Sequence, residues 1–220
     1  MPSSVITTVA DAAGRTLAAM TSGIAALRSA DKPLHPEGEM RAGTLVRTGA
    51  VELTGASWLD DLGQDDVLVR VSHAIGLPGP VPDIEGLALR IPSAGDDDRY
   101  GDVLLATTGW NPLMRHVLVP AWSREQTFTT LLPYRTLTGP VVLGARPLGP
   151  DDFELSWARL GKDWQAFGAL HLAERLPEQT EVSFDPVLHV PDGLEQYPWV
   201  ERLRERSYAT ARRARREPMA

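Results

Sequence analysis

The chain has 220 residues, of which 43% are hydrophobic and 23% charged, proportions typical of one globular domain. Its net charge of −7 argues against a general nucleic-acid-binding protein, although the tail after Arg202 is locally basic. The absence of cysteine excludes disulfides, thiolate catalysis, cysteine-ligated zinc and iron–sulfur clusters. It also fits a cytoplasmic protein, which is the location we expect.

The first thirty residues predict an N-terminal helix. Apolar side chains recur there at three- and four-residue spacing over residues 5–29: Val9, Ala13, Leu17, Met20, Ile24 and Leu27. A signal peptide is not expected, because a basic leader is missing and Asp11 and Arg15 interrupt the apolar run. No stretch approaches the roughly 20 apolar residues of a membrane span. We expect this helix to lie on the domain body or across a partner subunit, which leaves a homodimer open.

Residues 31–186 predict an antiparallel β-barrel. The apolar pattern changes there to a period of two, and clusters of Gly, Pro and Asp separate the runs. About eight strands in a chain of this length favour closure into a barrel, because closure removes exposed sheet edges. The expected strands are Thr44–Val51, Val67–His73, Leu87–Ile91, Asp102–Thr108, Val141–Pro147, Phe153–Arg159, Gln165–Glu174 and Glu181–Phe184.

Helical segments are expected inside and after the barrel. Residues 111–118 favour a short helix between two strands. Residues 187–220 leave the barrel through Pro191-Asp192-Gly193 and turn helical from about Tyr197 to Arg216. The fold class is therefore α+β, with a single domain overall.

A basic face is predicted on this last helix. Arg204, Tyr208 and Arg215 are spaced by four and seven residues, which places them on one side of a helix. A phenol held against a guanidinium is a chemically reasonable axial ligand for haem iron. By itself an Arg-x-x-x-Tyr pattern in an arginine-rich tail more often belongs to a solvated helix.

Three segments together extend this hypothesis. They are residues 31–38 (DKPLHPEG), residues 69–90 with their VRVSHAIGLPG and PDIEGLALR portions, and residues 204–215 around Tyr208. Their content and order resemble three blocks of the haem catalases. The resemblance implies a catalase-like core, one haem b, and activity on peroxide or organic hydroperoxide, with the chain a short and diverged relative.

On the proximal side, the resemblance makes Tyr208 the iron ligand and Arg204 the cation beside its oxygen. Arg215, Lys32 and Arg70 correspond to residues that bind the haem propionates. Lysine at position 32 replaces the family's arginine, so a point charge stands in place of a bidentate fork.

On the distal side, His35 corresponds to the family's acid–base histidine and Leu34 to the aliphatic residue beside it. Ser72 corresponds to the serine that bonds the other ring nitrogen of that histidine. Such a bond would fix the tautomer that faces the iron.

The catalase distal asparagine has no counterpart at the corresponding place. The strand there ends in Leu104-Leu105-Ala106-Thr107-Thr108-Gly109, and Asn111 comes later. The loss favours peroxidase-type chemistry with weak or no oxygen release, and Thr107 or Thr108 remain as alternative hydroxyl donors. Two other classes stay open: a non-catalytic barrel that binds haem or an apolar small molecule, and, more remotely, a hydrolase that uses metal-bound water.

Overall fold

An up-and-down meander of antiparallel strands forms the body of the protein. The computed structural model describes residues 38–73, 84–121, 126–177 and 182–202. Eight strands follow one another around a closed barrel, and the pairing of β9 with β1 completes the circle. In order around the barrel they are β1 (Gly38–Thr48), β2 (Leu62–His73), β3 (Glu85–Ser93), β4 (Asp96–Thr108), β5 (Thr127–Thr129), β7 (Gly139–Pro147), β8 (Asp152–Arg159) and β9 (Gln165–Arg175).

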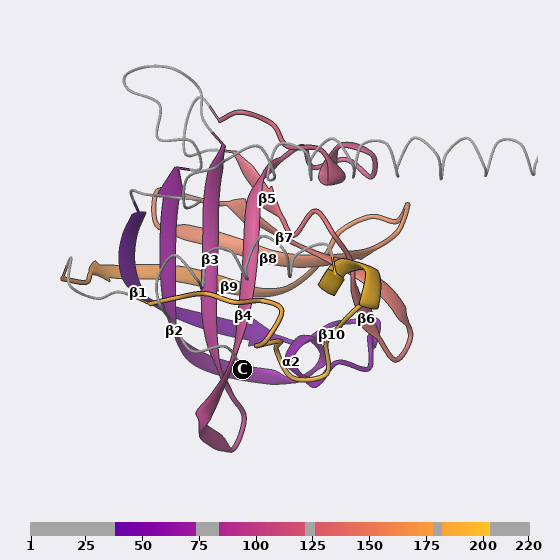
Figure 1. Ribbon diagram of the computed structural model, residues 1–220, viewed down its shortest axis with the longest axis horizontal. Coiled ribbons are helices and arrows are strands. Elements are labelled where there is room, and N and C mark those ends of the chain that lie inside the picture. Colours follow the sequence, from indigo (N-terminus) through magenta and orange to yellow (C-terminus); the bar gives the residue numbers. More distant parts are fainter. Residues whose placement is uncertain (1–37, 74–83, 122–125, 178–181, 203–220) are drawn as a thin grey trace, which may run out of the picture.

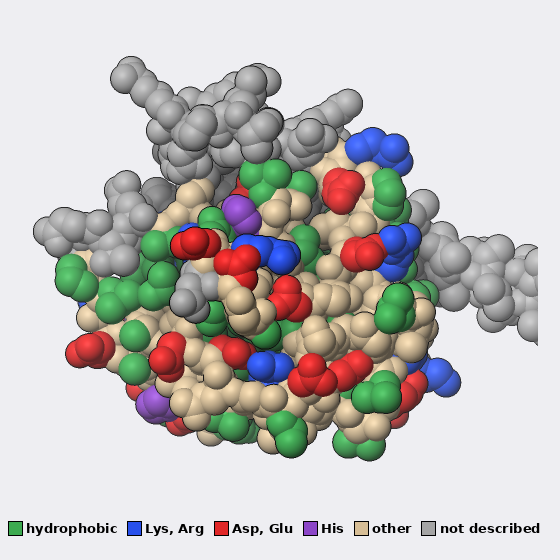
Figure 2. Space-filling view, turned by 90° about the horizontal axis from the view of Figure 1, so that it is seen from below, with side chains coloured by type: hydrophobic (Ala, Val, Ile, Leu, Met, Phe, Trp, Pro, Cys, Tyr) green, Lys and Arg blue, Asp and Glu red, His purple; other side chains and the backbone are tan. Residues whose placement is uncertain are grey.

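The barrel is flattened into two walls. In Figure 1 strands β2, β3 and β4 run from top to bottom in the near wall, while β7, β8 and β9 cross behind them at a steep angle. Such near-orthogonal crossing is one of the two ways in which twisted sheets pack face to face. The lower end, seen in Figure 2, carries interspersed acidic, basic and apolar side chains.

Alternation along the strands builds the core. In β3, Leu87, Leu89 and Ile91 are at most 2% exposed, and the residues between them face the opposite side. Two aromatic side chains from the far wall, Trp157 and Phe167, are also at most 1% exposed and belong to the same cluster. The interior is therefore filled by side chains, which agrees with what an eight-stranded barrel can enclose.

Two short strands extend the sheet beyond the closed barrel. Strand β6 (Tyr134–Thr136) pairs with β7, and β10 (Glu195–Gln196) pairs with β6. The link between near and far walls is narrow, because β5 pairs with only the last three residues of β4 and with two residues of β7. Residues 182–196, here called the strap, run from the near wall to β6.

The strap crosses the outside of the near wall before it pairs with β6. Figure 1 shows it running in front of β2, β3 and β4. The backbone N–H of Asp102 in β4 donates to the carbonyl of His189 at 3.1 Å, so the strap continues the hydrogen bonding of that strand. The backbone N–H of Trp58, in the one-turn helix α2 (Ser57–Asp60), donates to the carbonyl of Asp192 at 3.2 Å.

The expected closed antiparallel barrel is confirmed, and seven of its strands match expected ones. One expected strand is wrong: the described part of Glu181–Phe184, residues 182–184, is not a strand but the start of the strap. The eighth barrel strand is instead β5, whose three residues are too few to show a period in the sequence. The helix expected over residues 111–118 is a single 3-10 turn, η1 (Met114–His116).

The helices expected at the two chain ends can be followed only in part. The N-terminal helix, residues 1–30, lies outside the described residues. Of the C-terminal helix, residues 198–202 are described and are helical, with Val200 fully buried. No helix in the described ranges is long and apolar enough to cross a bilayer.

Candidate functional site

Strand pairing brings the first two catalase-like segments together. Gly38, the last residue of the first segment, pairs with Ser72. Ser72 pairs in turn with Gly86, and Gly86 pairs with Ala106 at the end of β4. The four residues form one row across four neighbouring strands, close to the C-terminal ends of β2 and β4. Segments that are about thirty residues apart in the sequence are therefore adjacent in the barrel.

This row and the next one lie on the outer face of the barrel. Val69 is fully buried in the core, and Val71 packs against it, so Arg70 and Ser72 point to the opposite side of β2. In the next row Arg70 pairs with Ala88. We call the outer-face group Arg70, Ser72, Gly86, Ala88 and Ala106 the shelf.

The shelf joins a cation to a group of small residues. The guanidinium of Arg70 lies across Gly38, where an added Cβ would come within 3.0 Å of its Nη2 atom. Glycine at position 38 is therefore what leaves room for this side chain. Gly86, Ala88 and Ala106 project little beyond the backbone, whereas the same outer row also contains Leu104, which pairs with Ala88, and Met40, which pairs with Arg70. Ser72 is only 5% exposed at the edge of this surface.

Of the two threonines considered as distal donors, Thr107 faces the barrel interior and Thr108 already donates its proton. Thr107 points into the barrel, and its hydroxyl accepts the backbone N–H of Glu85 at 3.2 Å. Thr108 is on the outer side, and its hydroxyl donates at 3.1 Å to that of Thr129, which donates at 2.5 Å to the carbonyl of Arg115. Both threonines are at most 1% exposed. Neither hydroxyl is offered to a ligand on the shelf.

Asn111 does not replace the missing amide either. Its side-chain oxygen accepts the backbone N–H groups of Leu113 and Met114 at 3.1 and 2.8 Å, and the residue is exposed. This local bond starts the turn that leads into η1. The asparagine is therefore used as a turn residue.

Most of the site residues inferred from the sequence cannot be placed. Arg70 and Ser72 are described and lie two residues apart on one face of β2. The others lie outside the described residues: Lys32, Leu34, His35, Arg204, Tyr208 and Arg215.

The strap limits the shelf on its lower side. Arg90, one pair below Ala88 on the outer face of β3, forms a two-bond ion pair with the fully buried carboxylate of Asp102, at 2.8 and 2.7 Å. The same carboxylate accepts the backbone N–H of Asp185 at 2.7 Å, and Arg90 donates to the carbonyl of Ser183 at 2.5 Å. No pattern in the sequence indicates this arrangement, because the strap residues Ser183 and Asp185 are 93 and 83 positions from their partners Arg90 and Asp102.

A second buried polar group lies at η1. Arg115 and His116 are each 1% exposed, and burial lowers the pKa of both side chains. The Nδ1 atom of His116 lies 2.7 Å from the carbonyl of Leu131, which can only accept, so Nδ1 carries the proton. Within the described structure the Nε and Nη1 atoms of Arg115 and the Nε2 atom of His116 have no hydrogen-bond partner. The guanidinium of Arg115 instead stacks on Trp164, 4.3 Å from the ring centre.

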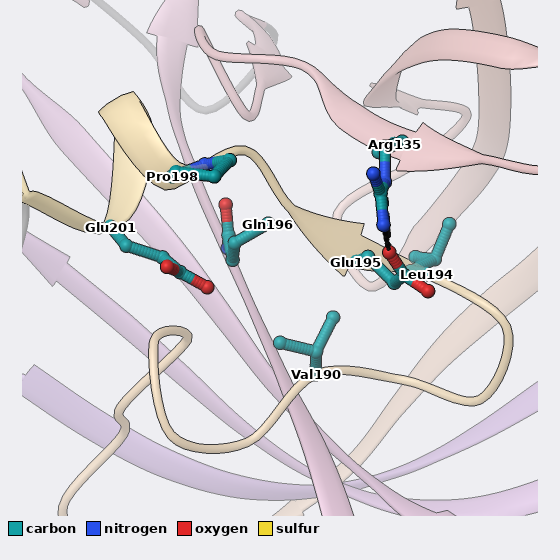
Figure 3. Close-up of a pocket in the computed structure, with 7 residues that line it drawn as sticks. All are labelled: Arg135, Val190, Leu194, Glu195, Gln196, Pro198 and Glu201. Atoms are coloured by element: carbon teal, nitrogen blue, oxygen red, sulfur yellow. Dashed lines mark hydrogen bonds and ion pairs between the residues drawn. The ribbon is translucent and has the colours of Figure 1, made fainter.

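An open hollow of about 410 Å³ lies beside β10. Figure 3 shows Gln196, Pro198 and Glu201 on one side of it and the Arg135–Glu195 ion pair on the other. Several polar side chains that line the hollow are already paired. Arg135 and Glu195 neutralise each other, and Gln196 donates to the carbonyl of Pro186 at 2.9 Å. The hollow offers no convergent reactive groups.

A much smaller void of about 20 Å³ lies at one mouth of the barrel, between Glu39, Glu85 and Phe153 among others. That space suits about one water molecule. A small apolar ligand would not fit in this void.

In the described part of the chain, no group of three or more His, Asp or Glu side chains could hold a metal ion. The comparisons with known proteins add no family: no protein-family model matches the chain, and no curated protein sequence is significantly similar to it.

Proposed function

We propose that the chain binds haem b on the outer face of the barrel and acts on peroxide or organic hydroperoxide in a peroxidase-type reaction. The observation that carries this proposal is the pairing of Gly38 with Ser72 and of Ser72 with Gly86, which joins the first two catalase-like segments in one row. The third segment contributes Tyr208, the proposed iron ligand, with Arg204 beside its oxygen.

The shelf suits a planar apolar group with carboxylates. Gly86, Ala88 and Ala106 are small, Leu104 beside Ala88 adds an apolar side chain, and Arg70 supplies a guanidinium in the same row. Lys32 and Arg215 complete the proposed set of cations for the two propionates. When bound, haem would supply the iron chemistry that cleaves the O–O bond.

His35 is the proposed acid–base group. It is three positions before Gly38 in the sequence, and three residues can span up to about 11 Å, a length that would allow contact with Ser72. A Ser72 hydroxyl bonded to one ring nitrogen would leave the other free to take a proton from the peroxide and return it to the leaving oxygen.

A visible absorption spectrum of the purified protein with added haem tests binding. The wild type should show a Soret band and the ferric spectrum of a tyrosinate ligand. Tyr208→Phe should lose the tyrosinate features, and Arg204→Ala should weaken them. Tyr197→Phe, in the same part of the chain, is the control and should keep them. A wild type without a Soret band would refute haem binding.

Oxygen-electrode and dye-oxidation assays on one haem-loaded sample test the reaction. Because Thr107 faces the barrel interior and the hydroxyl of Thr108 donates to Thr129, dye oxidation should exceed oxygen release. His35→Ala should keep haem but lose about 10²–10⁴-fold in rate, the usual contribution of a general acid–base group. Vigorous oxygen release would show that another distal donor exists.

The alternative, a carrier that binds haem or an apolar molecule without turnover, is favoured by the same engaged threonines. It predicts equal rates of peroxide consumption for wild type and His35→Ala, both at the level of exposed haem.

A further inference from the structure

The barrel wall has its fewest strand pairs between β4 and β7, where β5 joins the two. Strand β5 pairs with three residues of β4 and with two residues of β7. The residues after β5 add to this link, because the backbone N–H of Thr130 donates to the carbonyl of Leu143 in β7 at 3.0 Å. We call residues 127–132 the seam. A change that loosens the seam would open the barrel between its two walls.

The seam contains a strained backbone turn. Leu131 has a φ of +60° and is the only residue other than glycine with a positive φ in the described structure. The backbone N–H of Leu132 donates to the carbonyl of Thr130 at 2.6 Å, which closes a γ-turn around Leu131. A γ-turn with positive φ is rare and strained, because the Cβ atom of an L-residue crowds the backbone there. Such a turn persists only where its surroundings hold it in place.

The 3-10 turn η1 holds the seam through two side chain–backbone bonds. The Nδ1 atom of His116 donates to the carbonyl of Leu131 at 2.7 Å, and the hydroxyl of Thr129 donates to the carbonyl of Arg115 at 2.5 Å. The side chains of Arg115 and His116 are each 1% exposed, so water does not compete for the first bond. We call Arg115 and His116 the latch.

The latch fits a neutral imidazole. Because Nδ1 carries the proton of the neutral ring, the Nε2 atom is an acceptor, and it has no hydrogen-bond partner in the described structure. A second ring proton would turn this buried atom into a charged donor with no acceptor, which is unfavourable. The guanidinium of Arg115 would add the repulsion of a like charge.

The elements packed against η1 supply no compensating charge to His116 in the described part of the chain. Strand β5 contains only threonine and phenylalanine, and the end of β4 beside η1 carries two threonines. In the turn after β8, the carbonyl of Lys162 accepts a bond from Arg115 at 2.8 Å, and the charge of Asp163 acts on Arg115. Burial and then Arg115 lower the pKa of His116, and only the bond to Leu131 opposes them.

We infer that the latch is an acid-sensitive switch in the barrel wall. A proton taken from solvent by Nε2 of His116 releases η1 from the seam, the strained turn at Leu131 relaxes, and β4 separates from β7. Phe128, which is 3% exposed and belongs to the core, would then reach water. The inference rests on described residues alone and does not require haem.

Native-state hydrogen–deuterium exchange of the haem-free full chain, from pH 5 to 7.5, tests the inference. Each rate is divided by the intrinsic rate at the same pH, which removes the direct effect of pH on exchange. Peptides that cover residues 113–118 and 127–132 should lose protection by up to about tenfold per pH unit below about pH 6.5, because the opened wall holds one more proton than the closed wall.

The dependence on urea separates opening of the seam from unfolding of the whole protein. Exchange in the seam peptides should respond little to low urea concentrations, since a local opening exposes little surface. Peptides of β3 should be better protected at every pH and should respond strongly to urea, because a central strand exchanges through global unfolding.

Two histidine variants complete the test. His116→Asn removes the titrating group but can keep the bond to Leu131, so it should abolish the pH dependence of the seam peptides. His171→Asn, at an exposed partner of Asp152, is the control and should retain that dependence.

Three results would overturn the inference. They are seam protection in the wild type that does not change below pH 6.5, a urea response of the seam as strong as that of β3, and an unchanged pH dependence in His116→Asn. The first two results come from the wild type alone, so the test stands even if His116→Asn does not fold.

Discussion

At the scale of single residues, the most unusual environment is that of the buried pair at η1. Arg115 and His116 are adjacent, almost fully buried, and incompletely bonded in the described structure. Desolvation disfavours the charged form of each, and the positive charge of Arg115 further lowers the pKa of His116. Neutral His116 is thus part of the folded state.

This environment predicts a loss of stability on acidification. The unfolded chain takes up a proton on His116 near pH 6.5, whereas the folded chain does so only at lower pH. Between these two pKa values the unfolded state holds more protons, so the free energy of unfolding rises with pH and falls as pH drops below about 6.5. His116→Asn, which can keep the bond to Leu131, should reduce this slope by at most about 1.4 kcal/mol per pH unit.

Urea unfolding from pH 5 to 8 at constant ionic strength measures that slope. His171→Asn is the matched control, because His171 is an exposed partner of Asp152. An unchanged slope in His116→Asn would mean that His116 does not remain neutral in the folded protein.

At the scale of elements, ion pairs link the strands of this protein in two environments, one buried and one exposed to water. The Arg90–Asp102 pair is buried and joins two strands to the strap. The Arg146–Glu154 pair joins two strands on the surface, with side chains 47% and 28% exposed. Water can replace the lost partner in the second pair but not in the first.

Removal of one partner should therefore have unequal costs. Asp102→Ala leaves Arg90 and the backbone N–H of Asp185 without their acceptor and should destabilise the protein by about 3–5 kcal/mol. Glu154→Gln should cost no more than about 1 kcal/mol. Chemical denaturation of the two variants compares them, and similar midpoints would show that solvent reaches Asp102.

At the scale of the whole molecule, the barrel depends on residues that follow its last barrel strand. Phe184, Leu194 and Val200 are between 0% and 7% exposed, and they come from the strap and the start of the last helix. Leu194 belongs to the same core cluster as the barrel strands, so the strap contributes directly to the core.

A chain that ends at residue 182 should consequently fail to fold cooperatively. Burial of three such side chains contributes about 5–9 kcal/mol, which is comparable to the 5–15 kcal/mol stability of a typical domain. A chain that ends at Arg202 keeps all three side chains and is the control. Thermal unfolding followed by circular dichroism would show a transition for the longer chain only; a sharp transition in both would show that the barrel closes without the strap.

Local periodicity explains which parts of the fold could be predicted from the sequence. Strands with regular alternation, such as the Leu87, Leu89 and Ile91 series in β3, could be located because a half-buried strand repeats every two residues. Closure into a barrel followed from the number of such strands. The adjacency of Arg70 and Ser72 on one face also follows from the period of two.

What the sequence by itself determined is thus the set of long strands, the antiparallel barrel and the shared face of Arg70 and Ser72, because these depend on local periodicity. Only the tertiary structure decided that Gly38, Ser72, Gly86 and Ala106 form one row, that Thr107 and Thr108 are engaged, and that Asp102 holds the strap. Each of these depends on which residues of separate segments become neighbours, and the period of two within one strand does not specify which residues of another segment lie opposite it.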